Sequence, residues 1–168
     1  MEKVNILMKP LTTVQIENME LIISPATDAE KIWAADLFSS SDPWIHLGVQ
    51  KEQLLKTCQD PEHLLFIAHC DKIPCGVIIM DPKGIAGSPY VKSIAVTSGQ
   101  RSEGIGAKMV LFAETYFSKI SRHMFLCVSS FNTRAQKFYL ELGYAKVGEF
   151  ENYIIEGESE ILMHKRLE

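Results

Sequence analysis

The segment from Gln100 to Gly106 has the clearest potential for chemistry, because it places two glycines between a predicted strand and a predicted helix. Residues 90–97 alternate and are β-branched, as in a strand, whereas the apolar residues after Gly104 have helical spacing. Such a corner directs several unpaired N–H groups and the positive end of a helix dipole at one point. The segment therefore predicts a binding site for phosphate.

Two common phosphate-binding patterns fit this segment poorly. The nucleotide-hydrolase pattern G-x-x-x-x-G-K-[ST] matches the separation of Gly99 and Gly104, but neither the lysine nor the hydroxyl residue follows. The dinucleotide pattern G-x-G-x-x-G matches Gly104 and Gly106, but Met109 stands where its last small residue belongs. A tight corner that uses glycine only for backbone geometry is the alternative without a ligand.

A second group of polar and small residues follows on a predicted helix, 132–142, after a predicted strand, 124–128. The side chain of Asn132 can cap the helix or bond an extended amide chain, and Ala135 allows a ligand to approach closely. Tyr139 lies one turn beyond Ala135 on the same face, so its phenol can donate a hydrogen bond to a ligand bound there. A helix cap and a core aromatic are the alternatives that need no ligand.

The two segments together resemble the GCN5-related N-acetyltransferase (GNAT) family. Residues 101–106, R-x-x-G-x-G, are similar to the family's pyrophosphate loop, and residues 126–144 are similar to its L-x-V…N-x-x-A-x-x-x-Y-x-x-x-G-[FY] segment. The resemblance extends from about residue 20 to the C-terminus. It implies an enzyme that transfers an acetyl group from acetyl-CoA to a primary amine of a small molecule or peptide, by direct attack in a ternary complex. A non-catalytic acyl-CoA-binding sensor is the alternative.

The resemblance also implies roles for single residues. Tyr139 is the implied catalytic residue, beside the sulfur of the cofactor. The loop would bind the pyrophosphate, and strand amides and the second helix would bind the pantetheine arm; these cofactor-binding residues are Ile94, Ala95, Val96, Arg101, Ser102, Glu103, Gly104, Ile105, Gly106, Asn132 and Ala135. Ser102 stands where the family often has glycine. We expect the Glu103 carboxylate to point into solvent, because it would repel a diphosphate.

The group that removes the proton from the amine is left open by the sequence. An alkylamine with a pKa of about 10 is only about one part in a thousand neutral at pH 7, which opposes attack by about 4 kcal/mol. The predicted strand 90–96 contains no carboxylate, so Asp81, Tyr90, Ser93, Glu160 and a water relay remain as candidates. The acidic residues from 149 to 160 form either a solvated hairpin face or a rim that attracts cationic amines.

The remaining elements predict an α/β (α+β) fold in one domain of residues 19–168, after an N-terminal extension of residues 1–18 that is either flexible or an added edge strand. Strands are expected at 20–24, 64–69, 75–80, 144–150 and 160–165, and a capping box at 27–30 should open a helix. A loop is expected over 81–89. The resemblance implies a mixed, mostly antiparallel sheet of about six to seven strands with about four helices, which opens where the fourth strand parts from the fifth.

Composition narrows the range of partners. A net charge of −4 argues against nucleic-acid binding, and no apolar run is long enough to span a bilayer. The N-terminus has no continuous apolar signal core, so we expect a cytoplasmic protein. The four cysteines form no CxxC pair, which favours reduced core thiols and no metal site. Homodimer formation is a possibility that the sequence leaves open.

Overall fold

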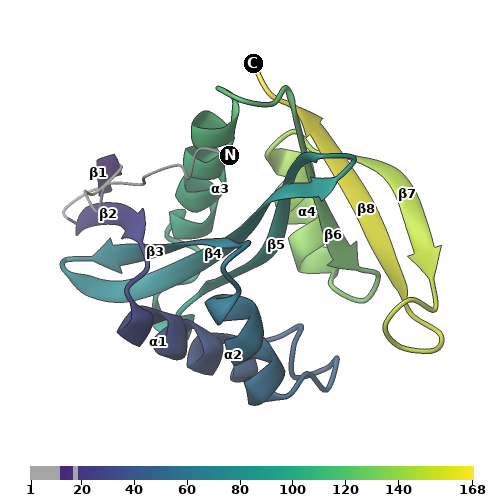
Figure 1. The fold of residues 1–168 in the computed structure, drawn as a ribbon, viewed down its shortest axis with the longest axis horizontal. Helices are drawn as coiled ribbons and strands as arrows, with labels where there is room; N and C mark the ends of the chain where they lie inside the picture. Colours follow the sequence, from purple (N-terminus) through teal and green to yellow (C-terminus); the bar gives the residue numbers. More distant parts are fainter. Residues whose placement is uncertain (1–11, 17–18) are drawn as a thin grey trace.

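The computed structural model describes residues 12–16 and 19–168. Its elements are β1 Thr12–Ile16, β2 Met19–Pro25, α1 Asp28–Ser39, α2 Lys51–Gln59, β3 Leu64–Cys70, β4 Ile73–Ile85, β5 Ser88–Val96, a 3₁₀ turn Ser98–Gln100, α3 Ile105–Phe117, β6 His123–Ser129, α4 Thr133–Glu141, β7 Ala145–Glu151 and β8 Ser159–Arg166. These strands form one sheet in the order β1-β2-β3-β4-β5-β6-β8-β7 (Figure 1). The mixed, mostly antiparallel sheet is confirmed, with eight strands in the described residues instead of six or seven.

The described part of the N-terminal extension is an edge strand. β1 pairs antiparallel with β2, from Thr12 opposite Ile23 to Ile16 opposite Met19. Residues 12–16 therefore form an edge strand, which is one of the two alternatives predicted for this extension. Residues 1–11 and 17–18 lie outside the described residues.

Two hydrophobic cores form on the two faces of the sheet. Figure 1 shows the helices that lie on both faces. On one face, α3 and α4 cover strand residues such as Phe66 and Leu126, and Met109 of α3 is completely buried. On the other face, α1 and α2 cover residues of β3, β4 and β5, with Phe38 of α1 at the centre. The predicted capping box starts α1, because the Thr27 hydroxyl accepts from the Glu30 N–H and the Glu30 carboxylate accepts from the Thr27 N–H.

The hairpin of β3 and β4 holds a disulfide between Cys70 and Cys75. The prediction of reduced thiols is wrong for this pair. The turn places the two Cα atoms 5.8 Å apart, which lies within the range that a disulfide requires. Spacing along the sequence does not contain this information, because it depends on where the hairpin turns. Cys58 and Cys127 are not in a disulfide.

The segment after Met80 is also more regular than expected. β4 continues to Ile85, and β5 begins at Ser88, so a two-residue turn of Ala86 and Gly87 replaces the predicted loop. Both turn residues have positive φ, which matches the right-handed twist of a tight hairpin.

A register shift lies within this hairpin. Ile79 pairs with Ser93, but Met80 pairs with Val91, so Lys92 is an extra residue in β5. The side chains of β5 therefore change faces: Val91 lies in the α3 core, and Ala95, an even number of residues later, lies in the α1 core.

β5 and β6 separate soon after they meet. They are parallel, and they pair only between Tyr90 and Phe125 and between Val91 and Leu126. β5 then continues to Val96 without a partner on β6, which leaves an opening between the two strands. This is the predicted separation, since β5 and β6 are the fourth and fifth strands counted from β2. In the part of the chain that is described, no helix has the length and apolar character needed to cross a membrane.

Candidate active site

The segment between β5 and α3 folds into a loop that presents backbone N–H groups. The Thr97 N–H donates to Cys75 O at 2.9 Å, which ties the start of the loop to β4. Ser102 and Gly104 both have positive φ, 76° and 79°, and such alternating backbone conformations form concave anion-binding sites. The first N–H bonded within α3 is that of Lys108, to Gly104 O, so the three N–H groups of residues 105–107 have no partner in the helix.

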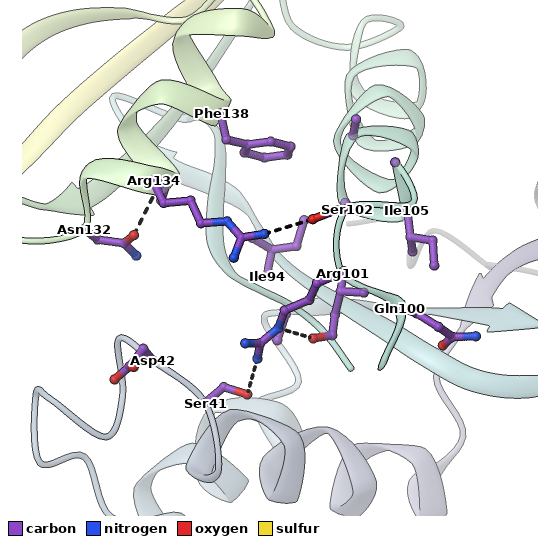
Figure 2. Close-up of a pocket in the computed structure, with 16 residues that line it drawn as sticks. Ser41, Asp42, Ile94, Gln100, Arg101, Ser102, Ile105, Asn132, Arg134 and Phe138 are labelled. Carbon is purple, nitrogen blue, oxygen red and sulfur yellow. Dashed lines mark hydrogen bonds between the residues drawn. The ribbon is translucent and has the colours of Figure 1, made fainter. Parts of the chain in front are cut away.

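This loop borders a pocket of about 620 Å³ that lies between α1, β5, α3 and α4 (Figure 2). Ten residues predicted from the sequence line it: Ile94, Ala95, Val96, Arg101, Ser102, Gly104, Ile105, Gly106, Asn132 and Ala135. Six further lining residues were not predicted: Ser41, Asp42, Gln100, Ala107, Arg134 and Phe138. Glu103 and Tyr139, which were predicted, do not line this pocket. Glu103 is solvent-exposed, as expected for a carboxylate beside an anion site.

Two guanidinium groups give the pocket its positive charge. Arg101 donates from Nε to Val96 O at 3.1 Å and from Nη2 to Ser41 Oγ at 3.3 Å, so its side chain is fixed along the wall. Arg134 extends from α4 toward the loop, and its Nη2 donates to Ser102 Oγ at 3.3 Å (Figure 2). A site with two guanidinium groups and unpaired amides is suited to a diphosphate.

The sequence contains one signal that points to Arg134. The residue lies in the first turn of α4, where a positive charge is unfavourable against the helix dipole. A cation placed there without an acidic residue in the same turn suggests a role other than stabilising the helix.

Asn132 caps α4, and its predicted bond to an extended amide chain stays a prediction. Its Oδ1 accepts from the Ala135 N–H at 3.1 Å, which caps α4, and the residue also lines the pocket. Ala135 and Phe138 are three residues apart on the helix, so both reach the same wall. A Cβ at Gly106 would lie 3.6 Å from Phe138 Cζ, so α3 and α4 approach closely there.

Tyr139 lies in the core under α4. Its ring is 5% exposed and contacts Phe138 and Tyr144 edge-on, with centroid distances of 5.0 and 5.6 Å. Burial raises the pKa of the Tyr139 phenol, so the hydroxyl stays protonated. Its position neighbours the pocket wall formed by Phe138, but its catalytic role stays a prediction.

The four candidates for the proton acceptor lie in different surroundings. Asp81 accepts from the Lys83 N–H at 2.9 Å within its own strand, and Ser93 is half-buried beside the β5 bulge. Tyr90 and Glu160 lie closer together, because each interacts electrostatically with Cys127 of β6. Glu160 is 8% exposed, and the Ser129 hydroxyl donates to its Oε1 at 2.5 Å.

The fold and the donors that line this pocket suit a ligand that contains a diphosphate. A model of the Acetyltransferase (GNAT) family matches residues 28–144, and the chain therefore belongs to this family. The family and the fold predicted from the two motifs are confirmed. As a member of the family, the protein is an acetyl-CoA-dependent N-acetyltransferase.

Solved structures show the same fold at low sequence identity. An aminoglycoside 6'-N-acetyltransferase complexed with coenzyme A is 21% identical with a TM-score of 0.70, over 86% of this chain and 96% of that one. An aminoglycoside 6'-N-acetyltransferase from Enterococcus faecium is 21% identical with a TM-score of 0.67, over the same shares. The ribosomal-protein-S18-alanine N-acetyltransferase from Escherichia coli is 17% identical with a TM-score of 0.70, over 88% and 94%. No curated protein sequence matches the chain.

Proposed function

We propose that the pocket binds acetyl-CoA with its diphosphate on the loop 101–106 and its pantetheine arm along the unpaired edge of β5. The observation that carries this proposal is the convergence of the free N–H groups of residues 105–107 with Arg101 and Arg134 in one pocket. Backbone amides and guanidinium groups together offer a diphosphate more donors than either kind alone.

The thioester then lies toward the closed end of the opening between β5 and β6. Residues 94–96 of β5, which have no partner on β6, supply amides to the pantetheine arm, and one of these N–H groups polarises the thioester carbonyl. An amine attacks this carbonyl carbon, the C–N bond forms, and the C–S bond breaks. Tyr139, protonated at the end of the same helix that lines the pocket, donates a hydrogen bond to the departing thiolate.

The acceptor we propose is a cationic amine. The hairpin of β7 and β8 carries the carboxylates of Glu149, Glu151 and Glu156, and the chain as a whole has a net charge of −4. Such a surface concentrates cations near the opening. Two of the similar solved structures are aminoglycoside acetyltransferases, and one acetylates an alanine of a ribosomal protein. Aminoglycosides, polyamines and basic peptides are therefore the first amines to test as acceptors. A cytoplasmic location and a homodimer stay predictions.

Two measurements test this function. Calorimetry with acetyl-CoA should give a saturable binding heat, and release of free thiol from acetyl-CoA should become faster with at least one of kanamycin, spermidine or a lysine-containing peptide. Binding heat without thiol release for any amine would instead favour the acyl-CoA-binding sensor. The absence of binding heat at millimolar acetyl-CoA would overturn the proposed cofactor site.

A further inference from the structure

Glu160 is a buried carboxylate with a single hydrogen-bond partner among the described residues. Its side chain is 8% exposed, and Oε1 accepts from Ser129 Oγ at 2.5 Å. No hydrogen bond within the described part of the chain is made to Oε2. Oε2 is in contact with solvent, because the described residues contain a single fully buried side-chain oxygen without a hydrogen-bond partner, Glu114 Oε1. One oxygen of Glu160 is therefore available to a group that the protein itself does not supply.

Strand register places this carboxylate beside the opening between β5 and β6. Glu160 pairs with Ser129, and Cys127 and Phe125 are two and four residues earlier on β6, so their side chains share one face of the sheet. Tyr90, which pairs with Phe125 at the closed end of the opening, lies on that face too, because its neighbour Val91 belongs to the α3 core. The face thus carries a phenol, a thiol, a hydroxyl and a carboxylate.

This face is not covered by the helices that cover the rest of the sheet. The β6 residues of opposite parity, Met124, Leu126 and Val128, are buried in the core with α3 and α4. The core under α1 and α2 takes its strand residues from β3, β4 and β5 only, among the residues described. The Glu160 face is therefore on the side of β6 and β8 opposite α4, outside the core under α1 and α2.

We propose that Glu160, oriented by Ser129, receives the ammonium group of the acceptor and removes its proton. The proposal rests on the acetyl transfer proposed above. The carboxylate takes one proton from R–NH₃⁺, and the neutral amine attacks the thioester carbon. The C–N bond forms, the C–S bond breaks, and the second proton of the nitrogen passes to the thiolate. Glu160 then returns its proton to water, so the net products are the amide, the free thiol and one proton.

The surroundings of Glu160 favour this role. Burial raises the pKa of its carboxyl group, which makes the carboxylate a stronger base, and the hydrogen bond from Ser129 acts in the opposite direction. The titratable groups that interact with it are Tyr90 of β5 and Cys127 of β6, and burial raises the pKa of both. Both stay neutral near pH 7, and β7 faces Glu160 with Phe150, which does not titrate. The ammonium group of the acceptor is thus the cation that this carboxylate can pair with.

Glu158 provides a matched comparison. It accepts from the Ser130 hydroxyl at 2.6 Å, as Glu160 accepts from Ser129, but it is more exposed and lies before β8 begins. Removing either carboxylate changes the net charge of the chain by the same amount. A difference in kcat/KM between Glu158→Gln and Glu160→Gln therefore reflects the position of the carboxylate and not the loss of one negative charge.

The test measures thiol release against pH with acetyl-CoA and the best amine of the panel. In the unaltered enzyme, kcat/KM should rise as Glu160 loses its proton and then stay level up to the pKa of the amine, because the reactive pair is carboxylate and ammonium. Glu160→Gln should lower kcat/KM at pH 7 by about 100-fold or more and replace the level region by a continuous rise toward the pKa of the amine. Glu158→Gln should keep the level region.

Ser129→Ala supplies a second variant that keeps the carboxylate. Loss of the donated hydrogen bond raises the pKa of Glu160, so the acidic limb of kcat/KM should move to higher pH. The calorimetric affinity for acetyl-CoA should be unchanged in all three variants, which also shows that each is folded. An unchanged pH profile in Glu160→Gln, or an equal loss in Glu158→Gln, would overturn the role of Glu160 while leaving the proposed function intact. Absence of thiol release from the unaltered enzyme would instead overturn the proposed function itself.

Discussion

The guanidinium of Arg134 and the hydroxyl of Ser102 are 3.3 Å apart, although they belong to different elements on opposite sides of the cofactor pocket (Figure 2). This contact brings the first turn of α4 to the loop that presents free backbone amides. It holds the guanidinium at the place where a diphosphate would bind, so little side-chain entropy is lost when the cofactor arrives.

Replacing Arg134 by alanine should weaken acetyl-CoA binding by about tenfold, or about 1.4 kcal/mol, because a charge-assisted hydrogen bond is lost. Calorimetry at low and high salt checks this, and the difference between variant and parent should shrink as salt rises. Lys137→Ala is the control, since this lysine is on the same helix, 79% exposed and paired with Glu141. Equal losses in both variants would show that only the general charge matters.

Ser102 has a left-handed backbone conformation, with φ of 76°, although it is not glycine. Ser102→Gly should raise the free energy of unfolding by about 0.5–1 kcal/mol, because glycine adopts this conformation without strain. Ser102→Ala loses the same hydroxyl but keeps the strain, so it should give no such gain. Urea unfolding of the two variants separates the backbone effect from the contact with Arg134. A gain in Ser102→Ala as large as that in Ser102→Gly would contradict this explanation.

Tyr139→Phe should lower kcat by about 10- to 100-fold while the affinity for acetyl-CoA stays within about twofold, because the phenol acts on the departing sulfur. Burial raises the pKa of this phenol, so its titration should not appear in the pH profile of the parent enzyme. Tyr116→Phe, which removes a hydroxyl from the α3 side of the same core, is the control. Unchanged turnover in Tyr139→Phe would reduce Tyr139 to a packing residue.

Features encoded by neighbouring residues could be predicted from the sequence. The capping box at Thr27 and the Asn132 cap each depend on a few adjacent residues. Ten of the residues named from the sequence also line one pocket, because β5, the loop and α4 each position their own side chains by local geometry.

Features that depend on contacts distant in sequence could not be predicted in the same way. Arg134 reaches Ser102 only because α4 packs beside the start of α3. The disulfide of Cys70 and Cys75 depends on the turn of the hairpin, and the partner of Glu160 depends on the register of β6 with β8. The register in which two strands pair is set by tertiary packing. A pattern of polar and apolar residues indicates which face of a strand is buried, but it does not determine which residues of the two strands lie opposite each other.

The ion pair between Lys165 of β8 and Glu114 of α3 tests how the two halves of the sheet are held together. β5 and β6 pair through two residue pairs only, so contacts from β8 to α3 carry part of the connection. Lys165 of β8 donates from Nζ to Glu114 Oε2 of α3 at 2.7 Å, and the Glu114 side chain is 10% exposed. Lys165→Met leaves this carboxylate buried without its cation and should lower the free energy of unfolding by about 3 kcal/mol.

The double variant Lys165→Met with Glu114→Leu should recover most of that loss, because it removes both charges and keeps the apolar volume. Lys137→Met breaks the exposed pair with Glu141 and should cost less than about 1 kcal/mol, as surface pairs do. Urea unfolding of the three variants measures these differences. If Lys165→Met lowered the free energy of unfolding no more than Lys137→Met does, the pair of Lys165 and Glu114 would not stabilise the contact between β8 and α3. The two-pair junction of β5 and β6 would then hold the halves together with hydrophobic packing alone.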